Sequence, residues 1–408
     1  MYDVAIVNAG LGGLFAAALL SQRKKKVLVY TSTGMGYDAF GGWSADGFHA
    51  QPGPALAYGF EDGGELQLLF QELTLDGFVP RRTERYQVAL PDSRITVHAR
   101  REDTLEELHR ELPGDAPALV ALYDALDRES EKNAKSAVSR FFSRQRSGIQ
   151  FLRKFSLTEK ALTFYDVQSR LLCQKPLSAI PLSTLTTLCQ TQPFLMHDAY
   201  RNVADRLVDR ILRNGGEVRY AASAPELTFQ GNRISAIRTE QDEFTAHWFL
   251  LGRHDRHMVS RHFGIRSEAV PVGMSDHVFC LADYTRPADL FSLSLSREGD
   301  PATAPQGMRT LTALFYGQTD PVLDDRVVYR VGTMVPFLND FVVVLSRDIG
   351  ADEVILPESL AVKPVRSAGV EPLLFRSARK NLYVLNIDHP APQGLSLAVR
   401  KFVLHIGM

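Results

Sequence analysis

The sequence predicts a two-domain α/β protein: a doubly wound domain with a parallel sheet, and a second, mixed α+β domain. Two observations carry this prediction. The opening stretch holds a strand, a glycine-rich turn, a helix and a second strand, which is the repeating unit of a doubly wound sheet. The chain also has 408 residues, enough for two domains of roughly 100–200 residues each.

The composition narrows the class of protein. Apolar residues make up 45% of the chain and charged residues 23%, as in ordinary globular proteins. Lys and Arg number 46 against 47 Asp and Glu, so the net charge of −1 provides no electrostatic field that would attract nucleic acid, and we expect no nucleic-acid partner.

Three cysteines without a C-x-x-C pair fit a reducing cytosol. No apolar run reaches the ~18 residues of a membrane span, and the chain opens on a predicted strand rather than a signal peptide. We therefore expect a cytoplasmic protein.

The opening unit is the context that a dinucleotide-binding fingerprint requires. Residues 4–7 and 27–30 are predicted buried strands that flank a glycine turn and an Ala/Leu-rich helix. Gly10 would let the backbone approach a pyrophosphate, and Gly13 would let the helix pack closely on the strand. The helix N-terminus would offer free N–H groups and a positive dipole end to the phosphates. The candidate residues of this turn are Asn8, Gly10, Leu11, Gly12 and Gly13; the alternative is a βαβ unit that binds nothing.

Two positions depart from the fingerprint. Asn8 stands where the first glycine is expected, and asparagine tolerates positive φ better than other non-glycine residues. The second strand ends in Thr31 and Ser32, where an Asp or Glu would hold the ribose hydroxyls. These two hydroxyls are the candidate ribose contacts. Because they lack the charge-assisted strength of a carboxylate, we expect weakened cofactor affinity.

The blocks that follow carry a family resemblance. They are Gly41-Gly42, residues 48–56 before a predicted helix at 64–75, residues 91–114, residues 201–264, and residues 381–395. In order and spacing they resemble the phytoene desaturase-like branch of the flavin amine oxidase superfamily, whose members are FAD-dependent oxidoreductases. The resemblance implies a Rossmann-like FAD-binding domain over 1–80, 195–264 and 371–408, and a substrate domain over 81–194 and 265–370.

The resemblance also implies further site residues. FAD is the implied cofactor, although the glycine fingerprint alone serves NAD(P) as well. The family has a Gly-Asp pair at the flavin's ribityl chain and pyrophosphate. In this chain either residues 386–387 replace the pair, or one residue is inserted into it and only Asp388 remains. The implicated residues are Gly41 and Gly42 near the flavin, Ala224 with a backbone group against the adenine, Asp388 at the ribityl chain, and Gly394 in the piece that follows.

The predicted substrate domain combines helices and strands. Residues 115–195 are predicted to be helical, and their basic amphipathic part, 132–155, could contact an anionic membrane surface. A solvated helix with its apolar side in the core is the favoured interpretation of that segment. Runs at 278–281, 311–316 and 341–345 are expected in a mixed or antiparallel sheet.

A histidine group carries a weaker signal. His254, His257 and His262 lie close together with Asp255, but no carboxylate or cysteine completes a metal site nearby. We interpret them as exposed helix histidines and predict no metal. No nucleophile elbow, Walker loop or zinc-protease motif is found, so hydrolase and kinase functions have no support.

Two functions follow. The first is an FAD-dependent oxidoreductase that transfers a hydride between the flavin and a lipophilic or amine small molecule, in an apolar cavity between the domains. The second is a cofactor-depleted member of the same fold that binds a lipid or a protein, as Rab GDP-dissociation inhibitors keep related architecture without flavin catalysis. The sequence identifies neither a catalytic residue nor the oligomeric state.

Overall fold

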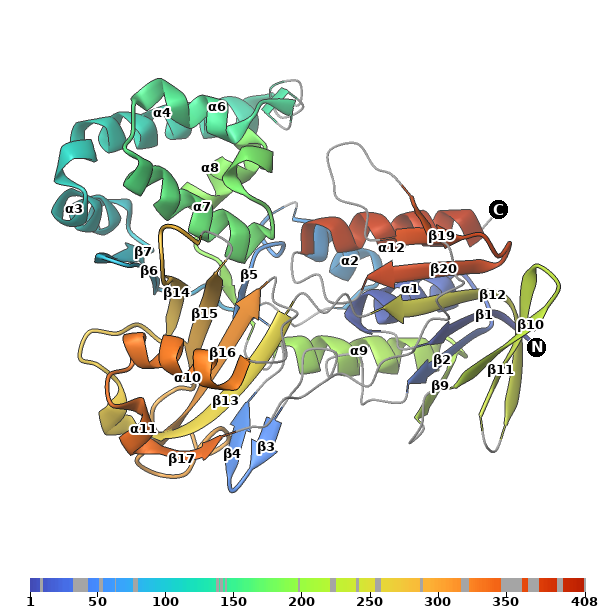
Figure 1. Ribbon diagram of the computed structural model, residues 1–408. Helices are drawn as coiled ribbons and strands as arrows, with labels where there is room; N and C mark the ends of the chain where they lie inside the picture. Colours follow the sequence, from blue (N-terminus) through green and yellow to red (C-terminus); the bar gives the residue numbers. More distant parts are fainter. Residues whose placement is uncertain are drawn as a thin grey trace.

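The protein is built on two large sheets that are covered by helices, and two small two-stranded sheets accompany them (Figure 1). The computed structural model describes residues 1–7, 10–31, 43–50, 54–62, 64–75, 80–136, 139, 142–143, 145–196, 199–220, 225–239, 242–253, 258–286, 289–316, 323–345, 362–365, 374–386 and 392–406. The predicted fold class is confirmed: one sheet is mainly parallel and the other is mixed.

The first sheet is nine-stranded and holds the opening unit. Its main path runs β18-β19-β20-β12-β1-β2-β9, and β10 and β11 attach to β12. The five strands from β20 to β9 are parallel, so their carboxyl ends meet at one edge. The strands are β1 Tyr2–Val7, β2 Val27–Thr31, β9 Glu217–Tyr220, β10 Glu226–Gln230, β11 Arg233–Arg238, β12 Glu243–Arg253, β18 Val362–Pro364, β19 Leu374–Ser377 and β20 Leu382–Asn386.

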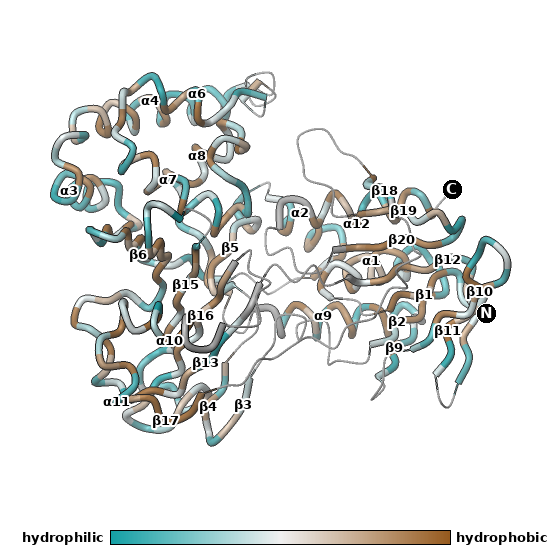
Figure 2. The backbone as a smooth tube through the Cα atoms, in the orientation of Figure 1, coloured by the Kyte–Doolittle hydropathy of each residue, from teal (hydrophilic) through white to brown (hydrophobic). Residues whose placement is uncertain are grey.

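Both faces of this sheet are buried, which explains the unbroken apolar run at its start. Val4 and Ile6 of β1 pack under helices, whereas Ala5 and Val7 pack under the β10–β11 hairpin. Figure 2 shows the hydrophobic colouring that follows the central strands. The helices of the first face are α1 Gly10–Gln22, α2 Glu65–Glu72, α9 Ala199–Arg213 and α12 Pro392–Ile406.

The second sheet is seven-stranded, in the order β17-β13-β16-β15-β14-β6-β7. It is antiparallel except for the parallel pair β14 and β6, and it contains all three predicted runs. The strands are β6 Arg85–Leu90, β7 Ser93–His98, β13 Met258–Arg266, β14 His277–Leu281, β15 Leu290–Leu295, β16 Met308–Tyr316 and β17 Val342–Leu345.

Helices cover both faces of the second sheet. One face packs under a helical layer, and the opposite face packs under a shorter helix pair. The layer consists of α3 Arg101–Glu111, α4 Ala116–Lys135, α6 Gly148–Leu152, α7 Glu159–Cys173 and α8 Leu182–Gln190; the pair is α10 Leu323–Met334 and α11 Leu338–Phe341.

Two further sheets have two strands each. β3 (Trp43–Ala45) pairs with β4 (Phe48–Ala50), and β5 (Leu56–Ala57) pairs with β8 (Phe194–Leu195). The β3–β4 hairpin packs on the seven-stranded sheet through β16. It belongs to the stretch predicted for the cofactor domain, so that stretch contributes to both halves of the molecule.

The structure moves two of the predicted domain boundaries. Residues 258–264 were expected in the cofactor domain, but β13 pairs with β16 along its whole length and joins the seven-stranded sheet. Conversely, residues 362–364 were expected in the substrate domain and pair with β19 in the nine-stranded sheet. Pairing between distant strands decides sheet membership, and local sequence does not encode it.

The basic segment 132–155 is partly built into the core. Phe151 and Leu152 are buried, while Lys132 and Arg146 form ion pairs with Glu129. These contacts agree with the core interpretation of the segment; contact with a membrane stays a prediction. Among the described residues, no helix is both long and apolar enough to cross a membrane.

Candidate functional site

The glycine turn leads directly into α1. Gly10 is the first residue of that helix and has φ of +47°, in the left-handed region that favours glycine. The first turn of α1 contains no acidic residue, and Gly10, Gly12 and Gly13 are buried. Leu11 packs against the helical core of the nine-stranded sheet. The free N–H groups and positive end of this 13-residue helix therefore suit a phosphate.

Gly12 lies at a close packing contact of α1, and the packing role predicted for Gly13 stays a prediction. A Cβ atom at Gly12 would lie 2.6 Å from Leu395 Cδ1 and 2.7 Å from Leu385 Cδ2. Gly12 thus lets α1 approach both α12 and the end of β20. Because Leu395 follows Gly394 in the first turn of α12, two of the predicted blocks meet here.

The ribose position is only partly described. Thr31 is the last residue of β2, is 4% exposed and pairs with Tyr220 of β9. It lies at the same sheet edge as the carboxyl end of β1, which is where doubly wound folds bind cofactors. The other predicted site residues lie outside the described part of the chain and stay predictions: Asn8, Ser32, Gly41, Gly42, Ala224 and Asp388.

These residues fit the phosphate part of FAD better than its ribose. Gly10 and the α1 N-terminus provide a phosphate cradle, and the first turn of α1 has no acidic side chain. At the end of β2, Thr31 provides a hydroxyl in place of the usual carboxylate. Among the described residues, those at the α1 N-terminus would therefore contact a bound FAD mainly at its pyrophosphate.

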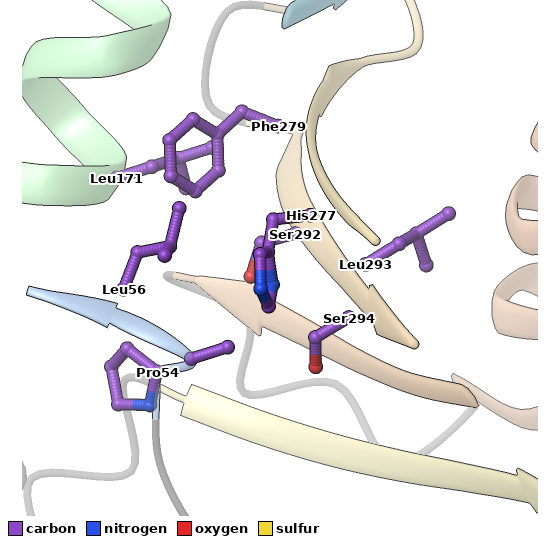
Figure 3. A pocket seen from close by; sticks show the side chains of 9 residues that line it. Pro54, Leu56, Leu171, His277, Phe279, Ser292, Leu293 and Ser294 are labelled. Carbon is purple, nitrogen blue, oxygen red and sulfur yellow. The ribbon is translucent and has the colours of Figure 1, made fainter. Parts of the chain in front are cut away.

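A cavity lies between β5 and the seven-stranded sheet (Figure 3). Its volume is ≈10 Å³, about the space of one water molecule. Leu56 of β5, Leu171 of α7 and Phe279 of β14 form apolar walls, and each is at most 5% exposed. Residues 54–56 come from the predicted cofactor stretch and the other lining residues from the predicted substrate stretches, so the cavity joins the two.

The floor of the cavity is polar, which differs from the apolar cavity that we predicted. His277, Ser292 and Ser294 line it together with the apolar walls. In Figure 3 the His277 ring lies beside Ser292, and Leu293 points away from them. Because paired residues of an antiparallel ladder share a face, the pairs His277–Ser294 and Phe279–Ser292 point to the same side of the sheet.

The polar floor is one end of a row that crosses four strands. Ser294 pairs with Thr312 of β16, and Thr312 pairs with His262 of β13. We call the four side chains His277, Ser294, Thr312 and His262 the polar row. The polar row was not predicted, although Ser292, Ser294 and Ser296 alternate with leucines in the sequence, which is its signal.

His262 corrects our interpretation of the histidine group. It lies on a strand, is 0% exposed, and its Nδ1 is 3.0 Å from Thr312 Oγ1. The Trp43 ring of the β3–β4 hairpin stacks on it at 5.9 Å. His262 is therefore not an exposed helix histidine; His254 and His257 lie outside the described residues.

Two polar side chains, Gln87 and Arg309, contact the segment at the start of β14, where His277 lies. Gln87 of β6 donates to the Gly273 carbonyl and accepts from the Ser275 N–H, at 3.0 Å each. Arg309, 7% exposed, donates to Asp276 and to the Ser296 carbonyl. These contacts, from β6 on one side and from β16 on the other, hold the segment before His277 in place.

Comparison with known proteins defines the class of this architecture. No family model matches the chain. Over its whole length it superposes on an oxidoreductase from Methanosarcina mazei (TM-score 0.64, 14% identity, 98% of this chain and 99% of the other). Putrescine oxidase and cyclohexylamine oxidase also match, with TM-scores of 0.55 and 0.52, identities of 12% and 11%, and at least 98% of each chain covered. The chain thus shares the fold of these oxidoreductases, and the predicted resemblance is confirmed.

Two further proteins are similar to this chain, one in sequence and one in structure. Prolycopene isomerase from Arabidopsis thaliana is 20% identical over an alignment of 373 residues that covers 76% of this chain and 62% of that protein. The chain thus spans about three fifths of the length of this curated relative. Rab GDI from Plasmodium falciparum shares the fold at a TM-score of 0.67 and 11% identity, over 98% of this chain and 97% of the other.

Proposed function

We propose that the protein is an FAD-dependent oxidoreductase that transfers a hydride between the flavin and a lipophilic small molecule. The observation that carries this proposal is the phosphate cradle at Gly10 in a chain that also encloses a cavity between β5 and the seven-stranded sheet. Bound FAD would supply the hydride acceptor or donor. The likeness to prolycopene isomerase supports a lipophilic substrate over an amine.

The residues of the chain would bind, orient and exclude water. The N-terminus of α1 would hold the pyrophosphate, and the Thr31 hydroxyl would meet the adenosine ribose. Leu56, Leu171 and Phe279 would keep water from the substrate, since each is almost fully buried at the cavity. A dry site of this kind strengthens the polar contacts inside it.

An absorption spectrum tests the proposal. We expect the purified protein to show flavin bands after incubation with excess FAD and gel filtration. Two matched variants probe the cradle: Gly10→Asn and Gly10→Asp both tolerate positive φ, but only the second places a negative charge beside the phosphates. We expect Gly10→Asp to bind FAD on the order of tenfold more weakly than Gly10→Asn. Equal affinities would contradict the phosphate cradle.

A second candidate is a cofactor-depleted binding protein of the same fold. The hydroxyl of Thr31 in place of a carboxylate favours it, and the Rab GDI match supports the same architecture in a protein of another kind. The same spectrum separates the two functions. A protein that stays colourless and ignores added FAD would favour the second candidate.

A further inference from the structure

Three strand ends lie side by side at the edge of the nine-stranded sheet that carries the phosphate cradle. β1, β2 and β9 are neighbouring parallel strands, so their carboxyl ends share that edge (Figure 1). Val7 pairs with Tyr30 and Thr31 pairs with Tyr220, so the three strands end within one residue of each other. Because adjacent strands lie about 4.8 Å apart, the end of β9 is about 10 Å from the end of β1.

Thr31 and Tyr220 lie on the helix-covered face of the sheet at this edge. Val29 of β2 and Val218 of β9 pack in the core beneath the helices, and the residue two positions further along a strand points to the same face. Thr31 is 4% exposed, whereas Tyr220 is 50% exposed. At the ends of these two strands the accessible side chain is therefore an aromatic ring rather than a hydroxyl.

The order of these strand ends matches the order of groups in an adenosine diphosphate. The N-terminus of α1, which follows β1, would hold the phosphates, and Thr31 on the next strand would meet the ribose. The third strand end, with Tyr220, then corresponds to the adenine base. An aromatic side chain can stack on the π-face of a base, and this contact needs no carboxylate.

We infer that this chain holds the adenosine half of FAD by stacking of the adenine on Tyr220, and that recognition of the ribose contributes little. The inference rests on the proposed function and specifies how its cofactor is bound. Where a carboxylate would hold the ribose hydroxyls by charge-assisted hydrogen bonds, Thr31 supplies only a neutral hydroxyl. Tyr220 is thus assigned as a cofactor-binding residue that compensates for the missing carboxylate.

Two nucleotides that differ by one oxygen test the ribose. ADP and 2′-deoxy-ADP have the same phosphates and base, and only ADP carries the 2′-hydroxyl that a carboxylate would bind. We expect their dissociation constants, measured by isothermal titration calorimetry, to agree within about threefold. Recognition of the ribose through a charge-assisted hydrogen bond would make ADP bind about tenfold more tightly or better. A preference of that size would overturn the inference.

Tyr220 variants test the base. Tyr220→Ala should weaken ADP binding about tenfold, and Tyr220→Phe should bind ADP within about twofold of the native chain, because the ring is what stacks. Tyr329→Ala is the matched control, since Tyr329 is a 74% exposed tyrosine of α10 on the other sheet, and it should bind ADP as the native chain does. Thermal melts show whether each variant is folded, and Tyr220→Leu, which keeps an apolar side chain on the strand, repeats the test. Unchanged ADP affinity in the alanine and leucine variants would overturn the assignment of Tyr220.

The ADP titrations and the flavin spectrum report on different claims. A chain that takes up FAD, but whose Tyr220→Ala variant binds FAD and ADP as the native chain does, overturns the inference and leaves the oxidoreductase proposal standing. A chain that stays colourless with FAD, yet loses ADP affinity in Tyr220→Ala, overturns the oxidoreductase proposal and supports the adenosine contact. A chain that takes up FAD but does not bind millimolar ADP would owe its affinity to the flavin half, which overturns the inference.

Discussion

At the scale of single residues, burial controls the chemistry of the cysteines. Cys173 and Cys280 are 5% and 1% exposed, and burial raises the pKa of the Cys173 thiol to about 12. Burial also raises the pKa values of Cys189 and Cys280. Because the thiolate is the reactive form, these thiols should be inert at neutral pH.

We therefore expect iodoacetamide at pH 7.5 to leave Cys173 and Cys280 of the native protein unmodified over hours. Cys189, which is less buried, should be the first to react. All three should react within minutes in guanidinium chloride, and mass spectrometry of the peptides gives the site of each adduct. Rapid native labelling of Cys173 would show that the core around α7 opens readily.

Single residues also show how far the sequence predicts the site. The glycine turn could be predicted because its members are contiguous and follow a strand. The polar row could not, because its four members lie on strands up to 50 residues apart and meet only through the register of β13 to β16. His262 resembled a helical residue by its spacing from His254 and His257, although residues 258–266 alternate as a strand does.

At the scale of elements, one glycine sets how the β3–β4 hairpin meets the seven-stranded sheet. A Cβ atom at Gly264 would lie 2.7 Å from Cζ of Phe48, which is 1% exposed. Gly264→Ala should therefore displace the hairpin and lower the free energy of unfolding by about 1–3 kcal/mol. Urea unfolding measures this change, and a shift in Trp43 emission reports the displaced hairpin.

A second glycine provides the control for this prediction. Gly332 lies in α10, and a Cβ atom there would meet nothing within 4 Å. Gly332→Ala should raise the free energy of unfolding by about 0.5–1 kcal/mol, because alanine favours the helix. If both substitutions had the same effect, the contact between Phe48 and Gly264 would not set the position of the hairpin.

The order of elements could be predicted more fully than their sheet membership. The strands around residues 217–251 and the helices at 64–75 and 203–212 lie where the apolar patterns indicate. The patterns do not distinguish β12 from β13, since each is an apolar strand flanked by polar residues. Their separation into two sheets depends on partners more than 40 residues away in the chain. β12 pairs with β20, and β13 pairs with β16.

At the scale of the whole molecule, the path of the chain ties the two sheets together. The chain passes from the nine-stranded sheet to the seven-stranded sheet after β2 and after β12, and returns after β7 and after β17. Neither sheet is a continuous stretch of sequence. Unfolding of one sheet would release the ends of segments that the other needs, so we expect the two to unfold together.

The two tryptophans report on the two sheets separately. Trp248 lies on β12 and contacts Tyr383 of β20, whereas Trp43 stacks on His262 of β13. In Trp43→Phe the remaining fluorescence follows the nine-stranded sheet, and in Trp248→Phe it follows the seven-stranded sheet. We expect the thermal transition of each variant to coincide with its own far-UV circular dichroism transition, because cooperative unfolding gives the same midpoint by every probe. Fluorescence and circular dichroism midpoints that separate within either variant would mean that the two sheets unfold independently.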